Sequence, residues 1–465
     1  MASTTHDTAE HRTPAPTRRR LLLTAMCVGM FLVQLDVTVV NVALPDIGSG
    51  LSTNLQGQQW VVDGYSVVLA SLLLAGGTLG DRYGHKRVVL AGLTLFGVAS
   101  LACGLASGIG VLIAGRAVQG LGAALLLPGT LAVIIRAYPG RAEQSRAVGV
   151  WAGVSALALP AGPLIGGALV SGLGWRFVFL INLPVVAVAL VATTRLVTES
   201  VDDEDRRLDP PGMVLATLTL AAIVYAVITA GHDGGSTPVW IAAAVAVLAS
   251  VGFLVWEQRA PAPLLPLPLL RKPAFAGANL VAAAMNLVGI GIVFVATLYL
   301  QTVQHHTAFV AGTMLLPLFV PLAALAPLTG RLTGRYGPRP LMTAGLAVGV
   351  AGSLSLLGLA PTSGYVRLLP VLLGLGIGMG LLTASVVAAA VQAVPADRSG
   401  LASGVNNTAR QAAGALAIAL YGAIAGTPHA PESFTSGLHV IGLLGAAAWL
   451  AAIVLTWLTV PRKTD

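Results

Sequence analysis

The sequence predicts an all-α integral membrane protein with fourteen transmembrane helices, arranged 6+2+6, and with both termini in the cytoplasm. Three observations lead to this fold class: the composition, the distribution of basic residues and an internal repeat. Of the 465 residues, 56% are hydrophobic and only 9% are charged, with a mean hydropathy of +0.84. An ordinary soluble domain has about 25% charged residues. Because a bilayer leaves no water for exposed backbone groups, we expect the spans to be helices.

Apolar runs long enough to cross a bilayer occur fourteen times in the chain. A helix needs roughly 20 apolar residues to cross about 30 Å of hydrocarbon. The predicted spans are residues 21–44, 59–80, 88–107, 111–135, 147–171, 177–197, 211–230, 238–256, 274–300, 308–330, 340–360, 367–394, 400–425 and 437–460. The first run is too long for a signal-peptide core and no convincing cleavage site follows it. We therefore expect residues 1–20 to be a disordered cytoplasmic tail before a retained first span.

The basic residues test this count, since Lys and Arg gather in cytoplasmic segments. With the N-terminus inside, all but four of the 26 Lys and Arg residues fall on the cytoplasmic side. Arg176 and Arg367 lie outside, and Arg116 and Arg410 lie within spans. The net charge of +8 is therefore a topology signal and not a nucleic-acid-binding patch. The two cysteines lie in apolar runs and indicate neither a disulfide framework nor a metal site.

A repeated segment divides the chain into two halves. Residues 74–92 align without gaps to residues 327–345, with the run Arg-Tyr-Gly identical at 82–84 and 335–337. The two copies are eight spans apart, so two spans are inserted between six-span halves. Such repeats are typical of transporters with a site near the midplane. The predicted units are an N-terminal bundle (21–197), a cytoplasmic linker (198–210), two inserted helices (211–256), a cytoplasmic connection (257–273) and a C-terminal bundle (274–460).

Ionisable residues deep in the predicted spans are rare and costly, so each is a functional candidate. Asp36 and Arg116 lie roughly 12 Å and 9 Å from the outer ends of spans 1 and 4. If these spans are neighbours, the two side chains can meet. An adjacent arginine favours the carboxylate, whereas desolvation opposes it. The pair is therefore a candidate proton-coupling site, and the alternative is a static ion pair that orients helices.

Two further ionisable residues in the predicted spans each allow two interpretations. Asp63 lies near the outer end of span 2, beside Trp60 and Tyr65, where it serves either proton coupling or an interfacial aromatic belt. Arg410 shares a helical face with Asn406, four residues earlier. This face forms either a polar lining of the second bundle or a helix-packing network. The residues predicted to line a substrate cavity are polar or aromatic positions within spans: Asn41, Gln119, Trp151, Asn406 and Arg410.

The loop GDRYGHKR at residues 80–87 is short, basic and rich in glycine. Its basic residues alone would be ordinary positive-inside anchors. The added Asp81, suited to a helix N-terminus, favours a cytoplasmic gate. In the repeat Gly334 replaces this aspartate, so only the first copy keeps the acid. The predicted gate residues are Gly77, Asp81, Arg82, Gly84 and Arg87.

The fifth span contains LPAGPLIGGAL at residues 159–169. Pro160 and Pro163 can bend a helix. Gly162, Gly166 and Gly167 allow another helix to approach closely. Helix packing alone is the alternative explanation for this helix-bend motif.

Four segments together resemble the major facilitator superfamily, specifically its fourteen-span drug:proton antiporter family. They are LDVTVVNVALPDI (35–47), GGTLGDRYGHKR (76–87), AGRAVQGLGAA (114–124) and LPAGPLIGGAL (159–169). The resemblance covers essentially the whole chain after residue 20, and the overall sequence is similar to actinobacterial methylenomycin-resistance-type and multidrug exporters. It implies the major-facilitator fold, proton coupling by Asp36 and Arg116, and a cytoplasmic gate formed by Asp81, Arg82 and Arg87.

We therefore expect a proton-coupled antiporter that exports antibiotics or other hydrophobic or amphipathic small molecules by alternating access. Spans 9 to 14 contain no acidic residue, which disfavours large polycations as substrates. No nucleotide-binding loop is present, so no cofactor is expected beyond a proton gradient. The expected partners are a drug or metabolite, protons and the lipid of a bacterial cytoplasmic membrane. The alternatives are a dedicated exporter of one metabolite or a non-transporting membrane sensor. No catalytic constellation indicates an enzyme.

Overall fold

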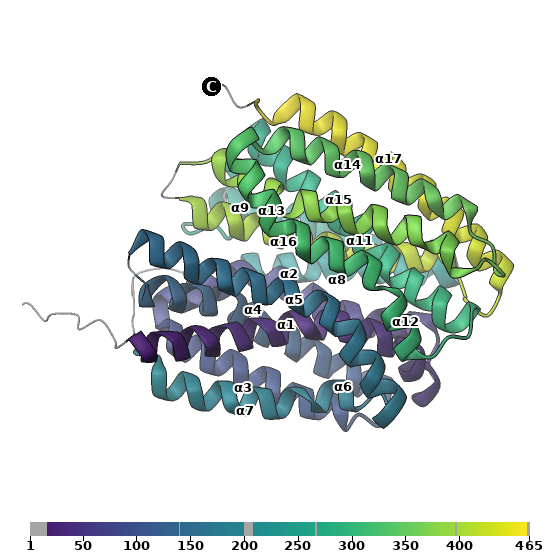
Figure 1. The fold of residues 1–465 in the computed structure, drawn as a ribbon, viewed down its shortest axis with the longest axis horizontal. Helices are drawn as coiled ribbons and strands as arrows, with labels where there is room; N and C mark the ends of the chain where they lie inside the picture. Colours follow the sequence, from purple (N-terminus) through teal and green to yellow (C-terminus); the bar gives the residue numbers. More distant parts are fainter. Residues whose placement is uncertain (1–15, 139, 200–207, 266, 396–397, 463–465) are drawn as a thin grey trace, which may run out of the picture.

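The computed structural model describes residues 16–138, 140–199, 208–265, 267–395 and 398–462, and these ranges contain helices and no strands. The first bundle consists of α1 (Pro16–Gly50), α2 (Leu55–Tyr83), α3 (His85–Gly104), α4 (Ile109–Ala137), α5 (Arg141–Leu173), α6 (Phe177–Leu180) and α7 (Asn182–Leu196). The inserted pair is α8 (Pro210–Asp233) and α9 (Thr237–Arg259). The remaining elements are α10 (Leu267–Leu270), α11 (Pro273–Leu298), η1 (Tyr299–Val303), α12 (Ala308–Met314), α13 (Leu316–Tyr336), α14 (Pro338–Leu354), η2 (Ser355–Gly358), α15 (Tyr365–Gln392), α16 (Ser399–Ala425) and α17 (Pro431–Thr459). Figure 1 shows the two bundles one above the other.

The all-helical membrane architecture is confirmed. Within the described ranges, 13 helices are long and apolar enough to cross a membrane. The predicted thirteenth span, α16, is not among them, although it has 27 residues. Its first half contains Asn406, Asn407, Arg410 and Gln411, which lower its hydropathy. The fourteen-span 6+2+6 count and the cytoplasmic side of the termini stay predictions.

Several helix ends differ from the predicted boundaries. Helix α1 begins at Pro16, so the end of the predicted tail is helical, while residues 1–15 lie outside the described ranges. Side chains mark other starts by accepting from backbone N–H groups two or three residues later, as N-caps do. Asn54 Oδ1 accepts from Gly57 N at 3.1 Å before α2. Asp209 Oδ1 accepts from Gly212 N at 3.0 Å before α8, which begins at the last residue of the predicted linker; residues 200–207 of that linker are not described.

The two bundles are joined at one end of the molecule. We call the end where α1 starts and α17 finishes the basic end, and the other the opposite end (Figure 1). Near the opposite end, Gln301 Nε2 donates to Val42 O at 2.9 Å. Gln59 Nε2 donates to Ile418 O at 3.0 Å. Ser171 Oγ likewise accepts from Phe309 N at 3.2 Å, so these hydrogen bonds between the bundles lie in this half.

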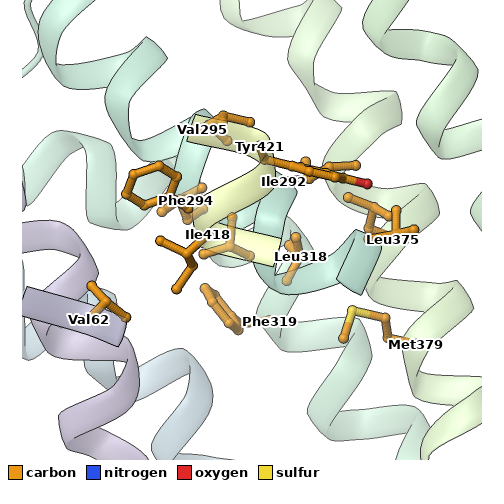
Figure 2. Packing of buried hydrophobic residues seen from close by; sticks show 14 of the residues in the cluster. Val62, Ile292, Phe294, Val295, Leu318, Phe319, Leu375, Met379, Ile418 and Tyr421 are labelled. Atoms are coloured by element: carbon orange, nitrogen blue, oxygen red, sulfur yellow. The ribbon is translucent and has the colours of Figure 1, made fainter. Parts of the chain in front are cut away.

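The buried apolar clusters follow the same asymmetry. One cluster crosses between the bundles: Val62 of α2 lies beside Phe294, Phe319 and Ile418 of the second bundle (Figure 2). A separate cluster fills the basic-end half of the first bundle and, within the described ranges, contains no residue of the second bundle. Because burial of apolar surface drives association, the bundles are held together mainly at the opposite end.

The predicted repeat is visible as repeated geometry. Gly84 and Gly337 both have positive φ, +96° and +80°, and each donates its N–H to the carbonyl four residues earlier. Each is preceded by an arginine over a tyrosine ring, 5.3 Å from the ring centroid in both copies. Gly92 faces Gly122 O, and its aligned partner Gly345 faces Gly378 O in the same way. The two halves therefore share their loop and their glycine-mediated helix contacts.

The inserted pair covers one side of the junction between the bundles. Helix α8 packs on both α2 and α16, whereas α9 packs chiefly on α8. The rings of Trp60 and Tyr225 lie 6.3 Å apart, and Gly231 allows α8 to approach Ala423. Helix α9 leaves large apolar side chains exposed, Trp240 at 68% and Leu248 at 71%. Such a face fits contact with lipid, since soluble monomers rarely expose large apolar patches.

Candidate functional site

The predicted pair of Asp36 and Arg116 is brought together inside the first bundle. Arg116 is fully buried and Asp36 is 1% exposed. Arg116 Nη1 donates to Asp36 Oδ2, and Arg116 Nε donates to Val61 O at 2.9 Å. The guanidinium also lies 4.4 Å from the Tyr65 ring centroid, a cation–π distance. Gly120, one turn later, lets α4 approach the Tyr65 carbonyl of α2, which places Arg116 deep between helices.

Polar side chains from three helices complete the surroundings of Asp36. Gln119 Nε2 of α4 and Asn182 Nδ2 of α7 approach Asp36 Oδ1 at 3.5 Å and 3.4 Å. Both amides also donate to Ser100 Oγ of α3, at 2.8 Å and 3.2 Å. Gln119 Oε1 in turn accepts from Arg116 Nη1 at 3.0 Å. The carboxylate is therefore bonded to α4 and α7 and, through Ser100, to α3.

In this arrangement the contacts between α1, α4 and α7 depend on the charge of Asp36. A buried ion pair is held only when its partners satisfy one another, and removing one charge is strongly destabilising. Protonation of Asp36 would remove the counter-charge of Arg116 without removing any atom. The bonds that join α1 to α4 and α7 would then weaken. The pair is therefore a position where the charge of one side chain affects the bonds between α1, α4 and α7.

The third predicted coupling residue, Asp63, is fully buried in the structure. Neither of its carboxylate oxygens has a hydrogen-bond partner among the described residues. Residues four apart share a helical face, so Asp63 lies on α2 between Gln59 and Val67. Gln59 bonds to α16, and Val67 packs in a cluster with Ala419 of α16. Asp63 therefore faces the junction of α2 with the second bundle.

The predicted cavity residues of the first half do not come together. Gln119 is fully buried in the Asp36 network. Asn41 is 4% exposed and donates to Val37 O of its own helix at 2.9 Å. Trp151 packs against the apolar cluster of the basic-end half. Gln119 therefore belongs to the interior of the first bundle, and half-buried Trp151 lies against an apolar cluster of that bundle.

The two predicted residues of the second half do lie together, on α16 facing α11. Asn406 is fully buried and donates from Nδ2 to Asn279 Oδ1 at 3.2 Å. Arg410 is half-buried and donates from Nε to Asn286 Oδ1 at 3.3 Å. This polar cluster is made of amides and one arginine.

A cavity of about 650 Å³ opens in the basic-end half, between the bundles and the inserted pair. Its walls are mostly apolar, with Thr78, Asp81, Asp209 and Arg398 at its polar positions. Ligand pockets in proteins have volumes of about 300–1,000 Å³ with few polar groups. It is lined by Leu73, Leu74, Ala75, Gly77, Thr78, Asp81, Pro128, Leu208, Asp209, Met213, Ala262, Pro263, Leu264, Arg398, Leu401 and Gly404. Two predicted gate residues, Gly77 and Asp81, are among them.

The rest of the predicted gate is tied to the end of α7. Asp81 Oδ1 lies 3.3 Å from His85 Nε2. Arg87 Nε lies 3.5 Å from Glu199 Oε2, and a Cβ on Gly84 would lie 2.2 Å from Glu199 Oε1. Arg82 lies over the Tyr83 ring. The loop is therefore packed against Glu199 at the beginning of the linker, so a movement of the loop would also displace the start of the linker.

The helix-bend motif packs against two different partners. A Cβ on Gly162 would lie 1.9 Å from Thr38 Oγ1, and a Cβ on Gly166 would lie 2.8 Å from Val39 Cγ2, both on α1. A Cβ on Gly167 would lie 2.6 Å from Phe309 Cα of α12. Across this contact, a Cβ on Gly312 would lie 2.2 Å from Pro163 O. Pro160 and Pro163 both lie inside α5, which continues through them. The motif thus brings two backbones together where the bundles join.

Ser100, Asn182, Asn279 and Asn286 are site residues that sequence reasoning missed. Each is a neutral polar side chain in an apolar run, and the two asparagines of α11 are seven residues apart, on one face. That spacing is the signal for the α11 pair. Ser100 and Asn182 come from helices whose mutual packing the sequence does not reveal.

Comparison with known proteins decides the family. Residues 26–418 match the model of the Major Facilitator Superfamily. The chain belongs to this superfamily. It is therefore a transporter by family and fold, and not an enzyme.

The relatives of this superfamily member include resistance proteins. It is 36% identical over 408 residues to the multidrug resistance protein Stp of Mycobacterium tuberculosis (strain CDC 1551 / Oshkosh), covering 87% of this chain and 75% of the relative. It is 36% identical over 444 residues to the methylenomycin A resistance protein of Streptomyces coelicolor, covering 95% and 92%. A crystal structure of the peptide transporter POT in complex with sulfate matches with a TM-score of 0.70 at 16% identity, covering 95% and 96%. This last likeness shows the fold.

Proposed function

We propose that this transporter is a proton-coupled antiporter that exports antibiotics or other hydrophobic or amphipathic small molecules by alternating access. The observation that carries the proposal is the buried pair of Asp36 and Arg116 within a membrane bundle. Charged residues in membrane spans are costly and typical of proton pathways. The names of the relatives, which are resistance proteins, support the solute class.

The described conformation fits the state that accepts solute from the basic end. The bundles are joined at the opposite end by the contacts of α5 with α12 and of Gln59 with α16. The cavity of about 650 Å³ lies in the basic-end half. Loops rich in Lys and Arg face the cytoplasm, so we assign the basic end to the cytoplasm. Solute would then enter from the cytoplasm and leave when the α5–α12 contact opens.

Protons returning inward would drive this cycle through the two buried aspartates. Protonation of Asp36 would release Arg116 from its counter-charge and loosen the network that joins α1, α4 and α7. Asp63 faces the α2–α16 junction without a donor, and an ionised carboxylate there would be costly. A neutral Asp63 therefore favours the closed junction, and its ionisation favours separation. The two residues would make opening of the opposite end depend on proton occupancy.

The test is transport by purified protein in proteoliposomes under an imposed pH gradient. Radiolabelled methylenomycin A and a panel of hydrophobic drugs would serve as solutes. We expect Asp36→Asn to abolish gradient-driven flux while solute exchange without a gradient persists. Asp46→Asn is the matched control, because Asp46 lies on the same helix, half-buried and outside the network. Full gradient-driven flux by Asp36→Asn would refute the assignment, and flux of one solute alone would indicate a dedicated exporter.

A further inference from the structure

Arg410 differs from the other arginine of the membrane interior, because within the described part of the chain it has no acidic partner. Arg116 is paired with Asp36. Arg410 Nε donates to Asn286 Oδ1 at 3.3 Å. A guanidinium has five N–H donors, and among the described residues neither terminal nitrogen of Arg410 makes a hydrogen bond.

The position of Arg410 is central in the molecule. It is the twelfth residue of the 27-residue helix α16, about 16 Å from the start of that helix. Helix α16 packs against α2, α8, α11, α15 and α17, so it has protein on most sides. Arg410 nonetheless keeps part of its surface exposed. Because α16 packs on α2 of the first bundle and Arg410 lies near the middle of α16, the residue lies close to the junction of the bundles and near the midplane, where transporters of this kind bind solute.

The groups around Arg410 are neutral amides. Asn286, which is 5% exposed, orients the guanidinium through its Oδ1. One turn earlier on the same face, Asn406 uses its Nδ2 to donate to Asn279. Asn406 Oδ1 is buried and has no partner among the described residues. These amides orient the Arg410 guanidinium but, being neutral, cannot compensate its positive charge.

We propose that Arg410 binds the oxyanion of an amphipathic solute, such as a carboxylate or a sulfonate, with Asn286 holding the guanidinium in place. This rests on the proposed export function and names its solute class. An unpaired charge in a membrane interior is expensive, and a bound anion compensates it. The planar guanidinium accepts an oxyanion through two parallel hydrogen bonds, which an ammonium does not match. The apolar part of the solute would lie against the apolar walls between the bundles.

The contrast with Arg116 explains why two arginines are used. Arg116 is enclosed and already compensated by a carboxylate of the chain itself, so it responds to protons. Arg410 is accessible and uncompensated, so it responds to solute. The same residue type therefore serves two different tasks because of what faces it.

The experiment is a binding measurement on purified protein in nanodiscs, which needs no proton gradient. The probes share one scaffold: pyrene-1-sulfonate as anion, 1-pyrenemethanol as neutral compound and pyrenylmethyl-trimethylammonium as cation. We expect the wild type to bind the anion more tightly than the other two. Arg410→Gln should weaken anion binding about 10- to 100-fold, the loss expected for a charged hydrogen bond, and leave the neutral probe unchanged. Arg410→Lys should recover only part of the loss.

Two further variants separate recognition from folding. Asn286→Ala should lower the affinity for the anionic probe selectively, because it releases the guanidinium without removing its charge. Gln411→Ala, on the next residue of α16, is the matched control and should bind all three probes as the wild type does. Absence of anion binding by the wild type, or equal anion affinity in wild type and Arg410→Gln, would overturn the inference. Arg410-dependent anion binding without proton-driven flux would leave it standing and refute the proposed function instead.

Discussion

The energetic coupling between Asp36 and Arg116 can be measured with a double-mutant cycle. The variants are Asp36→Asn, Arg116→Gln and the two combined. In Asp36→Asn, a fully buried arginine loses its only carboxylate and cannot release its proton. In Arg116→Gln, the carboxylate keeps two amide neighbours, at 3.4 Å and 3.5 Å, and can take up a proton. We therefore expect Asp36→Asn to be the more damaging single change.

The expected magnitudes follow from burial. Removing one partner of a buried pair costs about 3–5 kcal/mol, because it leaves the other charge uncompensated. The double variant leaves no charge, so it should recover much of that loss, with a coupling energy of about 2–3 kcal/mol. For a chain of this length, size scaling converts 3–5 kcal/mol into a fall in Tm of roughly 3–6 °C.

The assay is thermal unfolding of detergent-purified protein, followed by tryptophan fluorescence and by recovery of the folded species. Asp36→Asn should have a lower Tm than Arg116→Gln, and the double variant should lose about 2–3 kcal/mol less than the two single losses added together. Combining Arg116→Gln with Asp46→Asn provides a cycle in which no coupling is expected. If the Asp36–Arg116 losses simply add within about 0.5 kcal/mol, the two residues do not act as a pair and the reasoning fails.

Two glycine contacts give further predictions. Gly167→Ala should force α5 away from α12, slow transport and make a cysteine introduced at the opposite end react with a membrane-impermeant maleimide. Gly172 has open space around it, so Gly172→Ala should change neither transport nor labelling. Equal labelling of the two variants would contradict the proposed seal. Gly84→Ala and Gly174→Ala replace glycines of similar φ, +96° and +94°, so both should lose about 1–3 kcal/mol of stability to backbone strain. Only Gly84→Ala should also lower transport, because its methyl group meets Glu199; equal transport by the two variants would remove the gate loop from the cycle.

Residues whose physical cost is obvious could be predicted from the sequence. A carboxylate in an apolar run stands out whatever surrounds it, so Asp36 and Arg116 were identified and their proximity predicted. The repeat and the basic loops can also be predicted, because both are patterns along the chain. The apolar runs located the helices, although breaks such as Ile181, between α6 and α7, were not visible in them.

Properties that depend on which helix faces which could not be predicted. Gln119 was expected in a substrate cavity, but its face of α4 turns toward α3 and α1, where it bonds Ser100 and Asp36. Ser100 and Asn182 look ordinary in sequence, since single hydroxyls and amides are common in membrane helices. Asp63 is near a predicted span end, so the sequence leaves an interfacial role and a coupling role both open, and only the structure shows that its side chain is fully buried. Each of these depends on tertiary packing rather than on local pattern.

The matching contacts of Gly92 with Gly122 and of Gly345 with Gly378 show which feature the two halves share. Close backbone approach between helices leaves no room for a side chain, so glycine stands at both positions. The ionisable groups of the two halves differ: one half holds Asp36 and Asp63 and the other holds Arg410. Under the proposed function, one half would respond to the driving ion and the other to the solute. Engineering of solute preference should accordingly target α11 and α16 and leave Asp36 and Asp63 unchanged.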